Sequence, residues 1–255
     1  MSNIQNAFNN GKAFIGFITG GDPNIKKTKE FILEMIKAGA DLIEIGIPFS
    51  DPIAEGPVIQ EANNRALAAG TTVEKLFNLI ADLRKETSIP LAFLTYINPV
   101  FHYGYDTFFK RCRDTGLDGI IIPDLPFEEQ PPVREAVNKY DTDIISLIAP
   151  TSESRIKEIA KTASGFIYLV SSMGVTGIRG EITTNLADIT AAIKSVTPVP
   201  VAIGFGIHTP EQAAQMSRIA DGVIVGSAIV KIIAERGTQA APYIHRYVIK
   251  MKEAI

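Results

Sequence analysis

One acidic residue, Glu44, interrupts an apolar run at residues 41–48, which reads Asp-Leu-Ile-Glu-Ile-Gly-Ile-Pro. Successive side chains of a strand point to opposite faces, so Ile43 and Ile45 share one face and Glu44 lies on the other. A carboxylate inside a fold loses hydration, which is costly unless it is paired, hydrogen-bonded or protonated. We therefore expect Glu44 to serve catalysis or ligand binding. The structural alternative is an acid that is paired with a base or wetted at the end of its strand.

Three glycine-bearing segments lie late in the chain, each near the end of an apolar run: 174–177, 204–207 and 226–229. Glycine lets a backbone N–H approach an anion closely. In parallel barrels, the loops after the seventh and eighth strands and the N-terminus of a short helix form a recurrent phosphate site. We expect Ser227 to cap such a helix and to offer its hydroxyl. Each loop alone could be only a tight turn, but the three together predict phosphate binding.

Aromatic and aliphatic residues at other strand ends are expected to line the rest of a pocket, although each alone could belong to the core. They are Phe17, Leu94, Tyr96, Ile121, Tyr168 and Phe205. An acid, an apolar wall and a phosphate cradle together indicate acid-base chemistry on a flat or aromatic phosphate ester.

The elements that position these residues are eight short apolar runs with amphipathic stretches between them. The runs span 13–19, 41–48, 91–96, 119–124, 143–150, 165–172, 199–207 and 221–225. Helices are predicted over 26–38 and 73–85, and Thr209 with Pro210 marks another helix start. Buried strands that alternate with helices indicate a parallel sheet covered by helices.

Eight strand-helix units in 255 residues, without a linker-like stretch, predict a single (β/α)₈ TIM barrel domain over residues 1–255. The competing architecture is a doubly wound open sheet, which more often has fewer strands and a glycine-rich first turn. In the barrel, the active site lies at the C-terminal ends of the strands. Glu44 is near the end of the second.

Composition excludes several classes of function. The net charge of −3 and a pI near 5.7 give no basic field for nucleic acid or for anionic lipid. No apolar run is long enough to span a membrane, and the N-terminus does not resemble a signal peptide. The single cysteine, Cys112, fits a reducing compartment, so we expect a cytoplasmic protein. The three histidines lie in unrelated contexts and no nucleotide loop is present, so we expect neither a metal nor a cofactor.

Residues 44–60, Glu-Ile-Gly-Ile-Pro-Phe-Ser-Asp-Pro-Ile-Ala-Glu-Gly-Pro-Val-Ile-Gln, resemble the signature of the tryptophan synthase alpha subunit family. Further matching segments occur in family order at 17–23, 94–99, 122–126, 174–177, 204–207 and 226–230. Together they cover nearly the whole chain, which makes the pattern far more specific than any single motif. The resemblance implies a (β/α)₈ enzyme that cleaves indole-3-glycerol phosphate to indole and glyceraldehyde 3-phosphate, a retro-aldol reaction without a cofactor.

The resemblance also implies roles for individual residues. Glu44 matches the general acid/base, Glu55 matches the second acid, which stabilises charge at the indole N–H, and Thr176 matches a mobile sixth loop that meets this acid on closure. The indole and glycerol contacts correspond to Phe17, Ile59, Leu94, Tyr96, Ile121, Tyr168 and Phe205. The phosphate contacts correspond to Gly177, Gly206, Gly226 and Ser227.

The chain departs from the family at Glu55, because the second acid is most often aspartate. An added methylene moves the carboxylate by roughly 1–1.5 Å if the backbone stays in place, and such a shift can be costly in a preorganised site. Either the loop compensates or Glu55 contributes less. The structural alternative is a solvated loop acid.

The family further implies a partner, a pyridoxal-phosphate beta subunit that receives indole through a channel, in a linear αββα assembly. Positions at or near that contact correspond to Asp51, Pro52, Asn98, Asp124 and Pro126. Two other functions stay open at this point: a different phosphate-binding barrel, such as an isomerase, and an interaction protein that mainly activates a beta subunit. Indole release measured with and without a beta subunit would separate the three.

Overall fold

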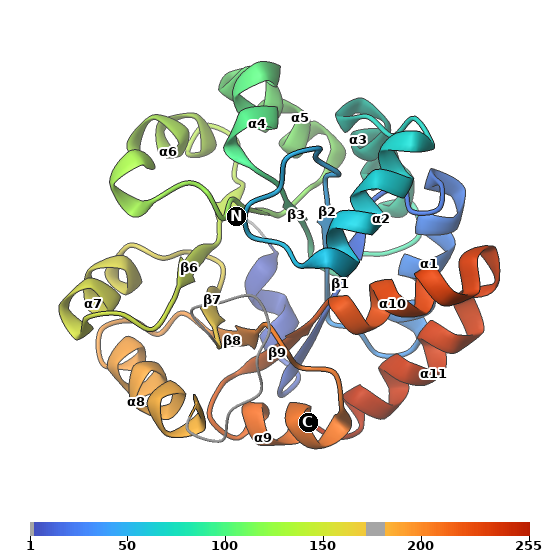
Figure 1. Cartoon of the computed structure of the whole chain (residues 1–255). Helices are drawn as coiled ribbons and strands as arrows, with labels where there is room; N and C mark the ends of the chain where they lie inside the picture. Colours follow the sequence, from blue (N-terminus) through green and yellow to red (C-terminus); the bar gives the residue numbers. More distant parts are fainter. Residues whose placement is uncertain (1–2, 172–181) are drawn as a thin grey trace.

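The computed structural model describes residues 3–171 and 182–255, and its strands form one parallel sheet. Neighbours in the sheet follow the order β5-β4-β3-β2-β1-β9-β8-β7-β6. The strands are β1 (Ala13–Thr19), β2 (Leu42–Gly46), β3 (Leu91–Leu94), β4 (Gly119–Ile121), β5 (Asp143–Ile144), β6 (Ser146–Ile148), β7 (Ile167–Val170), β8 (Val201–Gly204) and β9 (Gly222–Val225). Only Ile145 separates β5 from β6, so both ends of this order belong to one chain segment and the barrel is nearly closed (Figure 1).

The eight predicted runs therefore each contain a strand, with the fifth divided in two, and the (β/α)₈ barrel is confirmed. Helices surround the strands (Figure 1). They are α1 (Ile25–Lys37), α2 (Pro57–Ala68), α3 (Val73–Leu83), α4 (Ile97–Tyr103), α5 (Tyr105–Thr115), α6 (Pro131–Val137), α7 (Glu153–Lys161), α8 (Ile182–Lys194), α9 (Pro210–Ser217), α10 (Ser227–Arg236) and α11 (Ala241–Lys252). Three 3₁₀ helices, η1 (Ile4–Phe8), η2 (Phe127–Glu129) and η3 (Gly237–Gln239), complete the described elements.

Side-chain caps fix where several helices begin. The predicted helices over 26–38 and 73–85 correspond to α1 and α3, whose first turns are capped by the side chains of Asn24 and Thr72. Thr209 starts α9 in a capping box with Gln212, as the sequence predicted. Each cap satisfies N–H groups that the helix leaves without an internal partner.

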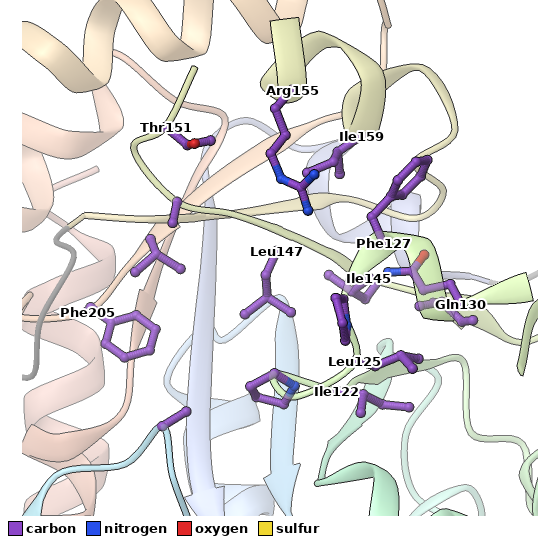
Figure 2. A pocket seen from close by; sticks show the side chains of 16 residues that line it. Ile122, Leu125, Phe127, Gln130, Ile145, Leu147, Thr151, Arg155, Ile159 and Phe205 are labelled. Carbon is purple, nitrogen blue, oxygen red and sulfur yellow. The ribbon is translucent and has the colours of Figure 1, made fainter. Parts of the chain in front are cut away.

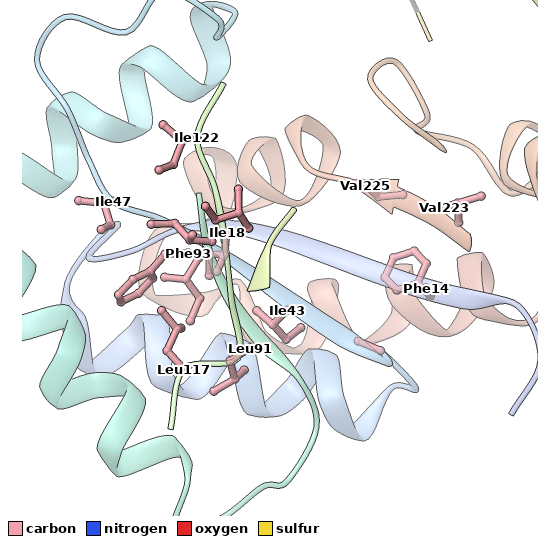
Figure 3. Packing of buried hydrophobic residues seen from close by; sticks show 14 of the residues in the cluster. Phe14, Ile18, Ile43, Ile47, Leu91, Phe93, Leu117, Ile122, Val223 and Val225 are labelled. Carbon is pink, nitrogen blue, oxygen red and sulfur yellow. The ribbon is translucent and has the colours of Figure 1, made fainter. Parts of the chain in front are cut away.

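The alternation along the strands separates two hydrophobic clusters. Ile43 and Ile45 belong to the outer cluster between the sheet and the helices, together with residues such as Phe14 and Phe93 (Figure 3). Leu42, which flanks Glu44, belongs to a smaller cluster inside the barrel. The acid therefore lies on the interior side of β2, as the period of two predicted.

The N-terminal end of the barrel is plugged by η1. Ile4 and Ala7 are buried within the interior cluster, and the ring of Phe8 lies 5.9 Å from that of Phe166. Gly119 gives room to Ile4, because an added Cβ would lie 3.0 Å from the Ile4 Cδ1 atom. A ligand must therefore enter from the other end, where the strands terminate.

Three aspartates, Asp41, Asp118 and Asp221, tie neighbouring strands together at this plugged end. Each carboxylate accepts a backbone N–H from an adjacent strand and pairs with a basic side chain. The N–H donors are Phe14 at 2.7 Å, Leu91 at 2.9 Å and Val201 at 2.9 Å, and the basic partners are Lys252, Arg84 and Lys194. These ties fix the strand ends far from the open mouth.

None of the helices in the described ranges is both long and apolar enough to cross a membrane.

Candidate active site

Glu44 is completely buried at the centre of β2, with Phe17 of β1 and Ala92 of β3 beside it in register. Neither carboxylate oxygen has a hydrogen-bond partner within residues 3–171 and 182–255. Burial alone raises the pKa of this carboxyl to about 8. Glu44 is therefore mostly protonated at neutral pH and is suited to donate a proton first and to accept one later.

Tyr168 of β7 is an ionisable neighbour of Glu44 inside the barrel. Burial, and then the charge of Glu44, raises the pKa of its hydroxyl well above the usual value. Its ring contacts that of Phe205 edge-on, with 5.9 Å between the centroids. Gly204 leaves the room for this ring, since an added Cβ would collide with the Tyr168 hydroxyl.

Phe17 forms a second wall, in a small cluster with Ile59 of α2 and with Leu94 at the end of β3. Gly46 and Gly226 leave room for the Phe17 ring. A Cβ added to Gly46 would lie 2.8 Å from this ring, and a Cβ added to Gly226 would lie 3.2 Å from it. The structure thus brings three of the predicted indole and glycerol contacts together.

Glu55 lies between β2 and α2, and its carboxylate is tied to that helix. The Asn63 amide donates to Glu55 Oε2 at 2.6 Å, and the Gln60 amide donates to the Glu55 carbonyl at 2.8 Å. Burial raises the pKa of the Glu55 carboxyl, and the Asn63 hydrogen bond lowers it. Glu55 is therefore a partly buried acid with a defined partner, rather than a freely solvated loop acid.

Tyr96, which follows β3 as the N-cap of α4, is hydrogen-bonded to the segment that carries Glu55. Its buried hydroxyl accepts the Ala54 N–H at 3.0 Å, and burial raises its pKa to about 12. Asp124, which acts on the same hydroxyl electrostatically, accepts the Ile97 N–H at 2.8 Å. Glu55, Tyr96 and Asp124, which follow β2, β3 and β4, therefore lie near one another at the mouth of the barrel.

Phe205 and Gly206, which follow β8, both have left-handed backbone conformations, with φ of 73° and 81°. This conformation is uncommon for a non-glycine residue and often marks a functional site. The Ser171 hydroxyl holds the strained turn by donating to the Phe205 carbonyl at 2.6 Å. An added Cβ on Gly206 would meet no heavy atom of the described chain within 4 Å, so the described residues leave this position open.

Ser227 differs from its prediction as a helix cap. Gly226 occupies the N-cap position of α10, Ser227 is the first helical residue, and no side chain caps this helix. This uncapped helix start favours anion binding, because its first N–H groups have no partners within the helix. Gly177, also predicted to contact the phosphate, and Thr176, predicted to meet the second acid, lie outside the described residues.

A cavity of about 440 Å³ lies beside the barrel mouth (Figure 2). Its lining includes Leu147, Val170 and Phe205, together with Gln130 of the α6 N-cap and Arg155 of α7. Most of the lining is apolar, which suits a flat hydrophobic ligand. Glu44 does not line this cavity, so the cavity adjoins the acid site without containing it.

The sequence reasoning missed several residues. Ile121, which was expected to line the pocket, lies in the interior cluster, and Leu147 and Val170, which were not singled out, pack against that cluster. Period-two alternation from Ile145 could have found Leu147. Asp22, which is buried, accepts two hydrogen bonds from Arg65 at 2.9 and 2.7 Å and so ties the β1–α1 connection to α2. No local pattern indicates that pair.

Within the described ranges, no group of three His, Cys, Asp or Glu residues could hold a metal ion.

Comparison with known proteins gives one consistent family. A family model described as the tryptophan synthase alpha chain matches residues 4–255. The tryptophan synthase alpha chain of Lacticaseibacillus casei is 51% identical over 255 residues, covering 100% of this chain and 96% of that protein.

Solved structures agree. The tryptophan synthase subunit alpha of Legionella pneumophila is 36% identical with a TM-score of 0.90, covering 100% of this chain and 98% of that chain. A chain of the tryptophan synthase a2b2 complex of Pyrococcus furiosus is 34% identical with a TM-score of 0.86, covering 95% of this chain and 99% of that chain.

Proposed function

The chain belongs to the tryptophan synthase alpha chain family, and on that premise we propose how its site residues divide the alpha reaction. The reaction is the carbon-carbon lyase step of tryptophan biosynthesis. It is the retro-aldol cleavage of indole-3-glycerol phosphate to indole and glyceraldehyde 3-phosphate. The family assignment sets aside the other phosphate-binding barrels.

Glu44 acts as the general acid and base. In its protonated form it gives a proton to C3 of the indole ring, and the resulting carboxylate then accepts the hydroxyl proton of the adjacent glycerol carbon. The carbon-carbon bond breaks as the carbon that carries this hydroxyl becomes the aldehyde carbon. The electron pair of the broken bond returns to the indole ring. The observation that carries this role is the burial of a carboxyl without a hydrogen-bond partner in the described chain, with a pKa of about 8.

Glu55 stabilises the positive charge that develops at the indole N–H when C3 is protonated. Its partial burial and its tie to Asn63 support a fixed acid at the rim of the mouth. An electrostatic group of this kind is most effective when its orientation is preorganised.

Substrate binding divides between the two sides of the mouth. Phe17, Ile59, Leu94, Tyr96, Ile121, Tyr168 and Phe205 form the hydrophobic seat for the indole and glycerol groups. Gly206, Gly226 and Ser227, together with Gly177, hold the phosphate at the α10 N-terminus. Thr176 is assigned to the second acid, Glu55. The uncapped helix start and the open surroundings of Gly206 support this phosphate site.

The alpha chain works with the tryptophan synthase beta subunit, to which it passes indole, in the α2β2 assembly seen for Pyrococcus furiosus. We place the contact near Asp51, Pro52, Asn98, Asp124 and Pro126, of which Asp51, Asn98 and Pro126 are exposed. We also propose a cytoplasmic location, for which the single cysteine remains the argument.

The test is indole release from indole-3-glycerol phosphate by the purified chain, alone and with the beta subunit. Glu44→Gln keeps the side-chain volume but cannot shuttle a proton, so kcat should fall by about 10²–10⁴-fold. Near-parent turnover in a folded variant would remove Glu44 from this role. A parent that never releases indole would instead support a protein that only activates its partner.

A further inference from the structure

Asn63 is a polar residue on the otherwise apolar face of α2, where Ile59, Ala62 and Ala66 are also buried. The side chain is only 2% exposed. A buried amide normally needs a hydrogen-bond partner. Here that partner is Glu55 Oε2, at the short distance of 2.6 Å.

The main chain around Glu55 is held on both sides. Gln60 donates to the Glu55 carbonyl at 2.8 Å, and the preceding N–H, that of Ala54, donates to the Tyr96 hydroxyl at 3.0 Å. The following residue, Gly56, is the N-cap of α2. The loop therefore has limited freedom to move, and the length of the side chain decides where the carboxylate lies.

Only glutamate spans this gap from the observed backbone. Each carbon-carbon bond is about 1.5 Å long, so an aspartate at position 55 would end roughly 1–1.5 Å short of the Glu55 carboxylate. Added to the observed 2.6 Å, that shortfall exceeds hydrogen-bond range in this backbone geometry. The other oxygen of Glu55, Oε1, accepts no hydrogen bond from the described part of the chain.

We propose that Asn63 is a positioning residue: its amide folds the longer Glu55 side chain back onto α2 and leaves Oε1 to face the indole N–H. The inference rests on the proposed role of Glu55. It also says how this chain accommodates a glutamate where its family mostly has aspartate, because the added length is taken up by the bond to α2. Glu55 and Asn63 then act as one unit.

A double-mutant cycle tests the pairing, with kcat and KM for indole release measured in four forms: the parent, Glu55→Asp, Asn63→Ala and the double variant. In the parent, Asn63→Ala should lower kcat by about tenfold or more while KM changes by less than about threefold. In the Glu55→Asp background, the same change should cost less than about threefold, because aspartate does not reach Asn63.

Asn64→Ala is the matched control, since Asn64 is the next residue of α2 and is exposed. It should leave kcat unchanged. Thermal unfolding shows whether each variant is folded, and Asn63→Ser replaces Asn63→Ala in the cycle should the alanine variant not fold.

Three results would overturn the pairing. In the parent, Asn63→Ala could lower kcat by less than about threefold, or it could change KM alone. In the Glu55→Asp background, Asn63→Ala could lower log kcat by more than half of its effect in the parent. Glu55→Ala separates this inference from the proposed function. Parent-like turnover in that variant would remove Glu55 from the reaction, whereas a costly Glu55→Ala with additive Asn63 effects would remove only the pairing.

Discussion

Glu44 joins two properties that oppose each other, complete burial and an ionisable carboxyl without a hydrogen-bond partner in the described residues. Its pKa of about 8 in the folded protein is well above the unfolded value of 4.5. The native state therefore binds more protons than the unfolded state between these two values, so its stability falls as pH rises across that window. This loss is the cost of keeping a proton donor inside the barrel.

The first prediction concerns the free energy of unfolding. The glutamine side chain of Glu44→Gln does not titrate, so the stability of this variant relative to the parent should rise from pH 5 to pH 8, by at most about 1.4 kcal/mol per pH unit. Urea unfolding at a series of pH values measures the difference. A constant difference across the series would show that Glu44 ionises normally in the fold.

Gly206 carries a second prediction at the residue scale. Gly206→Val should weaken the binding of glycerol phosphate by about tenfold or more, because the side chain would occupy the open space from which the phosphate approaches the backbone. Gly226→Val is less informative, because its side chain would first displace Phe17.

Gly11→Val is the matched control for Gly206→Val. Gly11 also has a left-handed φ and no heavy atom of the described chain within 4 Å of an added Cβ, but it precedes β1 at the plugged end. Both variants share the backbone strain. Equal affinities by calorimetry would argue against the phosphate site.

At the scale of elements, the two ends of the barrel serve different purposes. Asp41, Asp118 and Asp221 fix strand ends at the plugged end. At the open end, individual hydrogen bonds hold the Glu55 carboxylate to α2, the Tyr96 hydroxyl to the loop after β2, and the Phe205 carbonyl to Ser171. Stability and chemistry are therefore separated along the strands, as expected for this fold.

Asp118 tests that separation. Asp118→Ala leaves the partly buried Arg84 guanidinium and the Leu91 N–H without their carboxylate partner, so unfolding should become easier by about 3 kcal/mol. Indole release should be unchanged where the variant is folded. Asp114→Ala, which removes an exposed aspartate paired with Arg113, should change stability little. Equal stabilities of the two variants would contradict the role of the tie.

At the scale of the whole molecule, exposed apolar side chains accompany the residues proposed to contact the beta subunit. Ile53 is 76% exposed beside Pro52, and Phe101 is 64% exposed on α4, the helix that carries Asn98. Such residues commonly anchor protein interfaces.

The single-domain organisation over residues 1–255 stays a prediction.

We therefore predict a stable complex with the tryptophan synthase beta subunit and a higher cleavage rate within it. Phe101→Ser should weaken the complex by about tenfold or more while leaving indole release by the isolated chain unchanged. Leu67→Ser, at a partly exposed leucine of α2, provides the control. This assembly would be contradicted if sedimentation showed no complex and the rate of indole release did not change as beta subunit was added.

Much of the fold was predictable from local pattern. The eight apolar runs, the interior position of Glu44 and the caps of α1, α3 and α9 all follow from periodicity and residue type. These signals extend over a few neighbouring residues, which is why sequence alone carries them. The division of the fifth strand at Ile145 has no such signal.

The sequence by itself determined the barrel, the family and the acid placed inside it. Tertiary structure decided the properties that depend on distant neighbours: the pKa of Glu44, the bond from Asn63 to Glu55, and the position of Ser227 after an uncapped helix start. Burial and hydrogen bonding are set by residues far along the chain, so no local periodicity encodes them. The outcome at Glu55 rests on such contacts, because a longer side chain is useful only where α2 supplies an amide within its reach.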